Sequence, residues 1–215
     1  RELGLKYPWA GYGGSFKRWL IECEPKPYNS WGNGSGMRVS PVGFYAKSLD
    51  EALDLAKISA EVTHNHPEGI KGAQAIAAAV FLTKQGKSKD ELREYLETTF
   101  GYDLHRTIDG IRPEYTYDVS CMGSTPEAII AYLDSHDFES AIRNAVSIGG
   151  DSDTIGAMAG AVAQAVYEMP KALAGYCYGL LTSTLRHILD EFVGPIDNTT
   201  ADPFKLQQFF ELHPS

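Results

Sequence analysis

Repeated helix-start signals from Ser48 onward constrain the fold of this chain most strongly. Ser48 with Glu51, and Ser88 with Glu91, have the spacing of capping boxes, each placed before an amphipathic run. Pro67 and Pro126 stand where a first helical residue is expected, and Asp137 is a further N-cap candidate. The chain shows no convincing pairs of alternating strands. The expected helices cover about 48–62, 67–86, 88–100, 125–133, 137–149, 151–165, 170–178 and 181–192. The sequence therefore predicts an all-α, multi-helix domain.

The first part of the chain has a different character. Residues 11–43 are rich in Gly, Tyr, Trp, Pro and Asn, with one short helix expected through Phe16, Trp19 and Leu20. A long glycine-rich and aromatic segment inside a compact domain is more often functional than accidental. We predict a single domain over residues 1–215, with a loop segment at 1–45, a helical core at 46–194 and a C-terminal tail at 195–215.

Composition excludes several classes of partner. The 215 residues are 43% hydrophobic and 22% charged, with a net charge of −9 and a pI of about 5.1. This acidity disfavours nucleic acid as a general partner, although backbone amides can still hold a phosphate locally. No apolar run approaches the roughly 20 residues of a membrane span, so no membrane association is expected. Three scattered cysteines, Cys23, Cys121 and Cys177, are expected to be buried free thiols in a reducing cytoplasm.

Two aspartates and a threonine stand where an apolar helix begins. Asp151, Asp153 and Thr154 follow Gly149-Gly150 and precede a run of small apolar residues. One interpretation is ordinary capping, because Asp is common at an N-cap and in a first turn. The other is a site for Mg²⁺, Mn²⁺ or Ca²⁺, since hard oxygen ligands gathered at a turn suit such ions.

A second candidate is the glycine-rich run Gly32-Asn33-Gly34-Ser35-Gly36. Alternating glycines allow the backbone to approach a ligand closely, and their amides can form an anion nest. Asn33 tolerates a left-handed conformation and offers both a donor and an acceptor. A plain tight loop would explain the same glycines.

The third candidate is Thr63-His64-Asn65-His66-Pro67. Its two histidines have no third ligand at a standard spacing, so zinc binding is disfavoured. Caps and turn formers are the default interpretation, and His64 could instead line a pocket as a neutral donor. Near Cys121 no base is paired with the thiol, so Cys121–Pro126 is expected to be a loop entering a helix.

Together and in this order, three segments resemble the ADP-ribosylglycohydrolase family. They are 31–41, 63–69 and 147–154, and the resemblance extends from about Gly11 to Tyr167. It implies an all-α fold with two Mg²⁺ or Mn²⁺ ions in a cleft, in which Asp151 and Asp153 act in catalysis and bind metal together with Thr154. Gly32, Asn33, Gly34 and Ser35 would lie along the diphosphate and ribose of ADP-ribose, and His64 and Gly69 would line the same cleft.

The resemblance also implies a reaction and a partner. The reaction is hydrolysis of the bond between the distal ribose and a modified side chain or small molecule, with metal activating water. The partner would be ADP-ribose or an ADP-ribosylated protein. The family's Thr-Asp-Asp metal ligands are missing from this sequence, so we expect an N-terminally truncated chain, with supply of the missing part by a separate polypeptide as one alternative. A ligand-binding or structural relative without catalysis, like the J1 crystallins, is the alternative.

Overall fold

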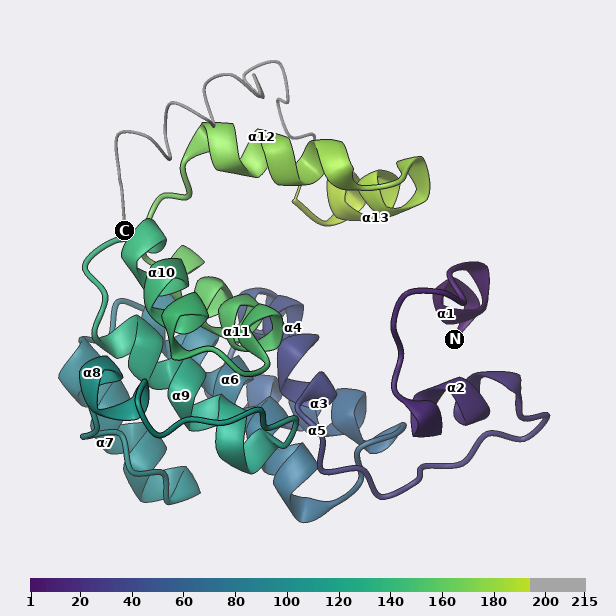
Figure 1. Cartoon of the computed structure of the whole chain (residues 1–215), viewed down its shortest axis with the longest axis horizontal. Coiled ribbons are helices and arrows are strands. Elements are labelled where there is room, and N and C mark those ends of the chain that lie inside the picture. Colours follow the sequence, from purple (N-terminus) through teal and green to yellow (C-terminus); the bar gives the residue numbers. More distant parts are fainter. Residues whose placement is uncertain (194–215) are drawn as a thin grey trace. The chain divides into compact units, whose positions relative to one another are not determined.

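The computed structural model describes residues 1–193, and the expected tail at 195–215 lies outside this part. Within it the chain is helical, without named strands, and the all-α prediction is confirmed (Figure 1). The helices are α1 (Glu2–Lys6), α2 (Gly14–Ile21), α3 (Gly34–Met37), α4 (Ser40–Tyr45), α5 (Leu49–Glu61), α6 (Pro67–Lys84), α7 (Lys89–Phe100), α8 (Ile108–Ile111), α9 (Cys121–Leu133), α10 (Phe138–Ile148), α11 (Ser152–Gln164), α12 (Lys171–Leu180) and α13 (Ser183–Val193).

The chain divides into two compact units. The first is Arg1–Val166, and the second begins at Tyr167 and contains α12 and α13. In the second unit the Tyr178 hydroxyl donates to the Asp190 carboxylate at 2.8 Å, which links its two helices. The organisation of residues 1–215 as a single domain stays a prediction.

Helix α6 is the centre of the first unit, because α3, α4, α5, α7, α9 and α11 all pack against it. Every side chain from Ala75 to Val80 is fully buried. A helix that is apolar on all faces is stable only when neighbours surround it, and its alanines let those neighbours approach closely. Helices α9, α10 and α11 also pack on one another (Figure 1). The core therefore lies where α6, α9 and α11 meet.

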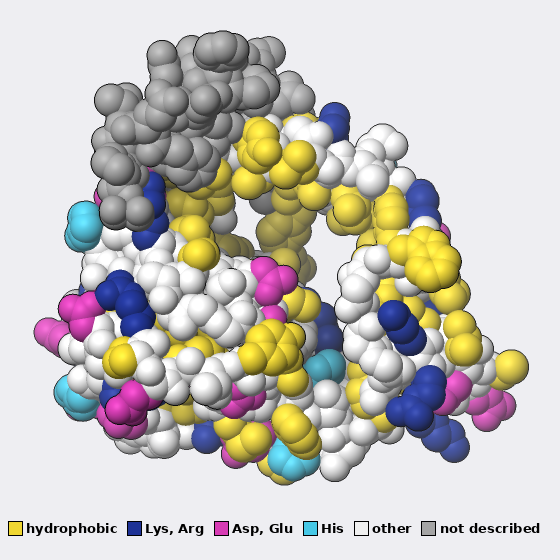
Figure 2. Space-filling view, in the orientation of Figure 1, with side chains coloured by type: hydrophobic (Ala, Val, Ile, Leu, Met, Phe, Trp, Pro, Cys, Tyr) yellow, Lys and Arg dark blue, Asp and Glu magenta, His cyan; other side chains and the backbone are white. Residues whose placement is uncertain are grey.

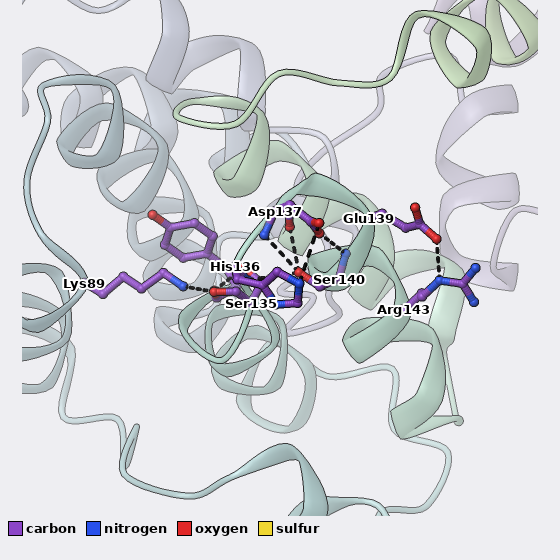
Figure 3. A network of polar contacts seen from close by, with 8 residues as sticks. Lys89, Ser135, His136, Asp137, Glu139, Ser140 and Arg143 are labelled. Atoms are coloured by element: carbon purple, nitrogen blue, oxygen red, sulfur yellow. Dashed lines mark hydrogen bonds and ion pairs between the residues drawn. The ribbon is translucent and has the colours of Figure 1, made fainter. Parts of the chain in front are cut away.

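All three predicted N-caps are present, but the full capping box is formed at only two of them. Ser88 accepts from the Glu91 amide while Glu91 accepts from the Ser88 amide, which makes a full capping box for α7. Asp137 and Ser140 form an equivalent box for α10, and next to it Lys89 donates to the Ser135 carbonyl (Figure 3). Lys89 also donates to the Leu133 carbonyl at 2.9 Å. For α5 the box is only half formed: Ser48 caps the helix, but the Glu51 carboxylate accepts from the Lys47 amide.

Helix α9 begins earlier than predicted. Its first residue is Cys121, and Pro126 lies inside it rather than at its first position. The physical reason is a competing cap, since the Ser120 hydroxyl accepts from the Gly123 amide at 3.0 Å and starts the helix there. The interpretation of Cys121–Pro126 as a loop was therefore wrong.

The glycine-rich N-terminal segment contains more helix than predicted. The expected helix through Phe16, Trp19 and Leu20 is present as α2. Helix α4 has Pro41 within its first turn, and α3 is a single turn over residues expected to form a loop. Helix α8 was also not predicted, and α1 extends to Lys6 although the sequence indicates only the end of a helix at residues 1–3. None of these four exceeds six residues, which is too short for apolar periodicity to signal.

The surface mixes charges of both signs. Figure 2 shows acidic and basic side chains interspersed on the face of the molecule that it presents. Within the described residues, no helix combines the length and the apolar character that crossing a membrane requires. Of the three free cysteines only Cys121 is buried, so the expectation of buried thiols was wrong for Cys23 and Cys177.

Candidate functional site

The turn before α11 directs an acidic side chain toward the glycine-rich segment. Gly149 and Gly150 both have positive φ, 80° and 60°, a conformation that favours glycine. Asp151 then occupies the N-cap position, but its side chain makes no capping hydrogen bond. Instead one carboxylate oxygen accepts from the Asn33 side-chain amide at 2.6 Å. The capping interpretation is therefore wrong for the Asp151 carboxylate.

Asn33 is held in place by the segment that leads into α9. Its backbone amide donates to the Val119 carbonyl at 2.8 Å, and the Cys121 amide donates to the Trp31 carbonyl at 2.9 Å. These bonds flank an isolated antiparallel bridge between Gly32 and Ser120. The Asn33 side chain is buried and is directed to Asp151. Two segments far apart in the sequence are thus joined at one point.

The run Gly32–Gly36 does not form the expected anion nest. A nest alternates right- and left-handed residues, whereas Asn33 has φ −72° and none of the glycines in this run has a positive φ. Gly34 and Gly36 permit close packing. A Cβ added at Gly34 would lie 3.3 Å from His64 Nε2, and one at Gly36 would lie 2.9 Å from the Met158 sulfur.

His64 lies against this run as a neutral side chain. It is 7% exposed, and its Nδ1 atom is 2.7 Å from the Thr63 hydroxyl. Burial, and after it the positive charge of Arg38, lower the pKa of His64 to about 4. The imidazole is therefore uncharged at neutral pH.

Gly69 contacts Ser35 and Ser30, beside the glycine-rich run. The Ser35 hydroxyl donates to the Gly69 carbonyl at 2.7 Å, and a Cβ at Gly69 would lie 2.6 Å from the Ser30 carbonyl oxygen. Cys121 fills the space beside Ser35, with 3.4 Å between sulfur and hydroxyl oxygen. Burial raises the pKa of the Cys121 thiol, so it packs as a neutral group.

The remaining predicted metal ligands lie at the start of α11. Asp153 is exposed, and one of its oxygens accepts from the Thr154 amide at 3.0 Å. The buried Thr154 hydroxyl points to the Met37 sulfur at 3.6 Å. Together with Asp151 they offer two carboxylates and a hydroxyl. These donors fit an ion such as Mg²⁺, which completes its shell with water and ligand oxygens.

A further observation concerns metal binding. Among residues 1–193, no three or more His, Cys, Asp and Glu side chains are grouped so that they could hold a metal ion together. The described residues therefore supply a partial donor set. Metal binding by Asp151, Asp153 and Thr154 stays a prediction.

Sequence reasoning missed two supporting residues, Arg38 and Tyr115. Arg38 donates to the Gly34 carbonyl and to the Thr63 hydroxyl, at 3.2 and 3.1 Å. Tyr115 lies against the Asp151 turn, where a Cβ at Gly150 would be 2.6 Å from its ring. Arg38 stands inside the segment that carries the resemblance, which could have drawn attention to it; no sequence pattern marks Tyr115.

Comparison with known proteins places this chain in a family. The sequence model of the ADP-ribosylglycohydrolase family matches residues 3–198. The chain belongs to the ADP-ribosylglycohydrolase family. A solved structure described as an ADP-ribosylglycohydrolase-related protein complex matches with a TM-score of 0.65 and 27% identity, covering 89% of this chain and 70% of that chain. The fold and the family thus agree.

Individual relatives match the chain at 28–34% identity. The chain is 34% identical over 144 residues to an uncharacterized protein of Archaeoglobus fulgidus, which covers 60% of this chain and 47% of that protein. It is 28% identical over 200 residues to ADP-ribosylhydrolase ARH3 of Bos taurus, covering 70% and 54%. To ADP-ribosylarginine hydrolase Tri1 of Pseudomonas putida it is 29% identical over 147 residues, covering 63% and 38%. The chain spans about half the length of the first of these curated relatives.

Proposed function

We propose that this chain binds ADP-ribose and takes part in hydrolysis of the bond between ADP-ribose and a protein side chain or small molecule. The observation that carries the proposal is the contact between Asn33 and Asp151, 2.6 Å long, next to the neutral His64. It joins two of the segments that carry the resemblance to the family and leaves the other oxygen of Asp151 without a hydrogen bond to residues 1–193. Relatives named as ADP-ribosyl hydrolases support the same reaction class.

Each side chain has a role in this proposal. The backbone from Gly32 to Ser35 lies along the diphosphate and ribose, because glycines without Cβ atoms permit that approach. His64 donates a hydrogen bond from its neutral ring, and Gly69 keeps room for the segment through its contact with Ser35. Asp151 accepts from ribose hydroxyls or orients the attacking water.

A divalent cation, Mg²⁺ or Mn²⁺, is part of the proposal. Asp151, Asp153 and Thr154 would hold it, because their carboxylate and hydroxyl oxygens are the donors that such ions prefer. When bound, the cation would supply charge that orients the ribose hydroxyls and acidifies a water. The protein residues themselves hold the sugar and exclude bulk water around His64, which is 7% exposed.

Calorimetry with ADP-ribose tests the proposal. We expect binding that is strong in Mg²⁺ or Mn²⁺ and weak in excess chelator, and that is lost in the Asp151→Ala, Asp153→Ala double variant. Release of ADP-ribose from serine- and arginine-modified peptides then tests hydrolysis and identifies the leaving group. Folded protein that binds no ADP-ribose in either condition contradicts the proposal. Binding that is indifferent to chelator, without release, favours the non-catalytic alternative.

A further inference from the structure

Two polar side chains, those of Arg38 and Thr63, connect the solvent-exposed surface to the buried His64 ring. Arg38 Nη2 donates to the Thr63 hydroxyl at 3.1 Å, and the Thr63 hydroxyl lies 2.7 Å from His64 Nδ1. Arg38 is itself fixed by two backbone carbonyls, those of Ser59 at 2.9 Å and Gly34 at 3.2 Å. Thr63 is 1% exposed, so water does not compete for its hydroxyl.

The donors and acceptors along Arg38, Thr63 and His64 indicate which ring nitrogen of His64 carries the hydrogen. A guanidinium can only donate, so the Thr63 oxygen accepts from Arg38. A donor with a positive charge polarises the hydroxyl that accepts from it and makes that hydroxyl a better donor in turn. Because Thr63 accepts from Arg38, its own hydrogen can point to His64 Nδ1, which lies 2.7 Å away.

This assignment decides what the other ring nitrogen offers. A neutral imidazole carries one hydrogen, so an accepting Nδ1 leaves that hydrogen on Nε2. The Nε2 atom faces the glycine-rich segment, 3.3 Å from where a Cβ at Gly34 would be and 3.6 Å from one at Gly32. We propose that Arg38 and Thr63 are positioning residues that fix His64 in its Nε2–H form, so that it donates to an acceptor oxygen of a ligand on Gly32–Gly34. Identification of that oxygen as belonging to ADP-ribose rests on the proposed function.

The tautomer can be measured without any ligand. In ¹⁵N-histidine-labelled protein, His64 Nδ1 should give the signal of an unprotonated nitrogen and Nε2 that of a protonated one, with assignment by the His64→Gln variant. The opposite pattern in the wild-type protein overturns the proposal. This wild-type spectrum decides the matter even if variants of Thr63 fail to fold.

Variants of Thr63 then test the relay. Thr63→Val removes the hydroxyl with little change of shape and should give a mixture of both tautomers, while Thr63→Ser should restore the wild-type pattern. Thr83→Val is the matched control, because Thr83 is a buried threonine of α6 that is 2% exposed; it should leave the spectrum unchanged. A wild-type tautomer in Thr63→Val would show that the relay does not set it.

Ligand affinity separates the two proposals. Thr63→Val should weaken ADP-ribose binding about fivefold, the effect of one net hydrogen bond, and Thr63→Ser should recover it. If the tautomer is as expected but ADP-ribose does not bind the wild type, the proposed function fails and the relay stands. If ADP-ribose binds and Thr63→Val shifts the tautomer without weakening binding, donation from Nε2 to the ligand is wrong.

Discussion

At the scale of single residues, the site depends on one contact between segments 118 positions apart, the hydrogen bond of Asn33 to Asp151. An amide that donates to a carboxylate over 2.6 Å is a charge-assisted bond, which is stronger than a neutral one. Because Asn33 is buried, its amide loses more than a surface group would when the acceptor is removed. The pair therefore couples the glycine-rich segment to the start of α11.

A double-mutant cycle should measure this coupling. We expect Asn33→Ala and Asp151→Ala each to lower the free energy of unfolding by about 1–2 kcal/mol, and the double variant to lose less than the sum, with a coupling energy of about 1–2 kcal/mol. Urea unfolding gives all values. Asp153→Ala is the matched control: Asp153 is exposed and its carboxylate accepts from the Thr154 amide rather than from Asn33, so this change should show no coupling to Asn33→Ala. Equal coupling for both aspartates would contradict the contact.

The neutral ring of His64 should make stability depend on pH. An unfolded histidine has a pKa of about 6.5. Burial, and then Arg38, lower the pKa of the folded state to about 4. Between these values the unfolded chain binds more protons, so this contribution to stability is complete above about pH 6.5 and is lost as the pH falls toward 4.

The measurement compares wild type with His64→Gln, which cannot titrate there. The difference in free energy of unfolding between the two proteins should shrink from pH 7 to pH 4, because only the wild type gains a penalty from protonation. A difference that stays constant across this range would show that His64 keeps an ordinary pKa. The other acidic groups affect both proteins equally and cancel.

At the scale of elements, most helices follow from local sequence, and the exceptions have identifiable causes. Helix α9 begins at Cys121 because the hydroxyl of its N-cap residue, Ser120, competes with the signal from Pro126. Helix α3 forms over a run that glycine content alone predicts to be a loop. The close approach of Gly34 to His64 and of Gly36 to Met158 favours glycine there, and these tertiary contacts are not visible in the sequence. Helix caps can therefore be predicted from the local sequence, whereas tertiary packing contacts cannot.

Substitution of Ser120 tests that explanation. Ser120→Ala removes the oxygen that accepts from the Gly123 amide and should lower the free energy of unfolding by about 1 kcal/mol, the usual effect of losing an N-cap. Ser59→Ala, a serine inside α5, is the control and should be nearly neutral. Chemical denaturation of the three proteins gives the comparison. A neutral Ser120→Ala would mean that α9 does not depend on this cap.

At the scale of the whole molecule, the resemblance identified segments that the structure brings together, namely Gly32–Ser35, His64, Gly69 and Asp151. The sequence alone could not show how they are held, because Arg38 and Tyr115 act through contacts between distant segments. The Asp151 carboxylate illustrates the limit. Its local context predicts a cap, and only the tertiary contact with Asn33 shows a different partner.

The same dependence on close packing extends to the centre of the first unit, where α6 meets α9. A Cβ at Gly72 would lie 2.4 Å from the Cys121 sulfur, so Gly72→Ala must push α6 and α9 apart beside Ser35. We expect a loss of about 1–3 kcal/mol in unfolding free energy and weaker ADP-ribose binding. Gly156→Ala is the matched control: this helical glycine has nothing within 4 Å of an added Cβ, so the change should stabilise by about 0.5–1 kcal/mol.

A second substitution isolates the cause of the Gly72 effect. Cys121→Ala removes the sulfur that the new methyl group would meet, so the Gly72→Ala, Cys121→Ala double variant should lose less stability than the sum of the two single changes. Thermal and urea unfolding of the four proteins measure this. If the stability losses of the two single variants simply add, the strain caused by Gly72→Ala arises at another contact of α6. Recovery of both stability and ADP-ribose affinity in the double variant would link the spacing of α6 and α9 to the position of the glycine-rich segment, since Cys121 also contacts Ser35 and the Gly32 carbonyl.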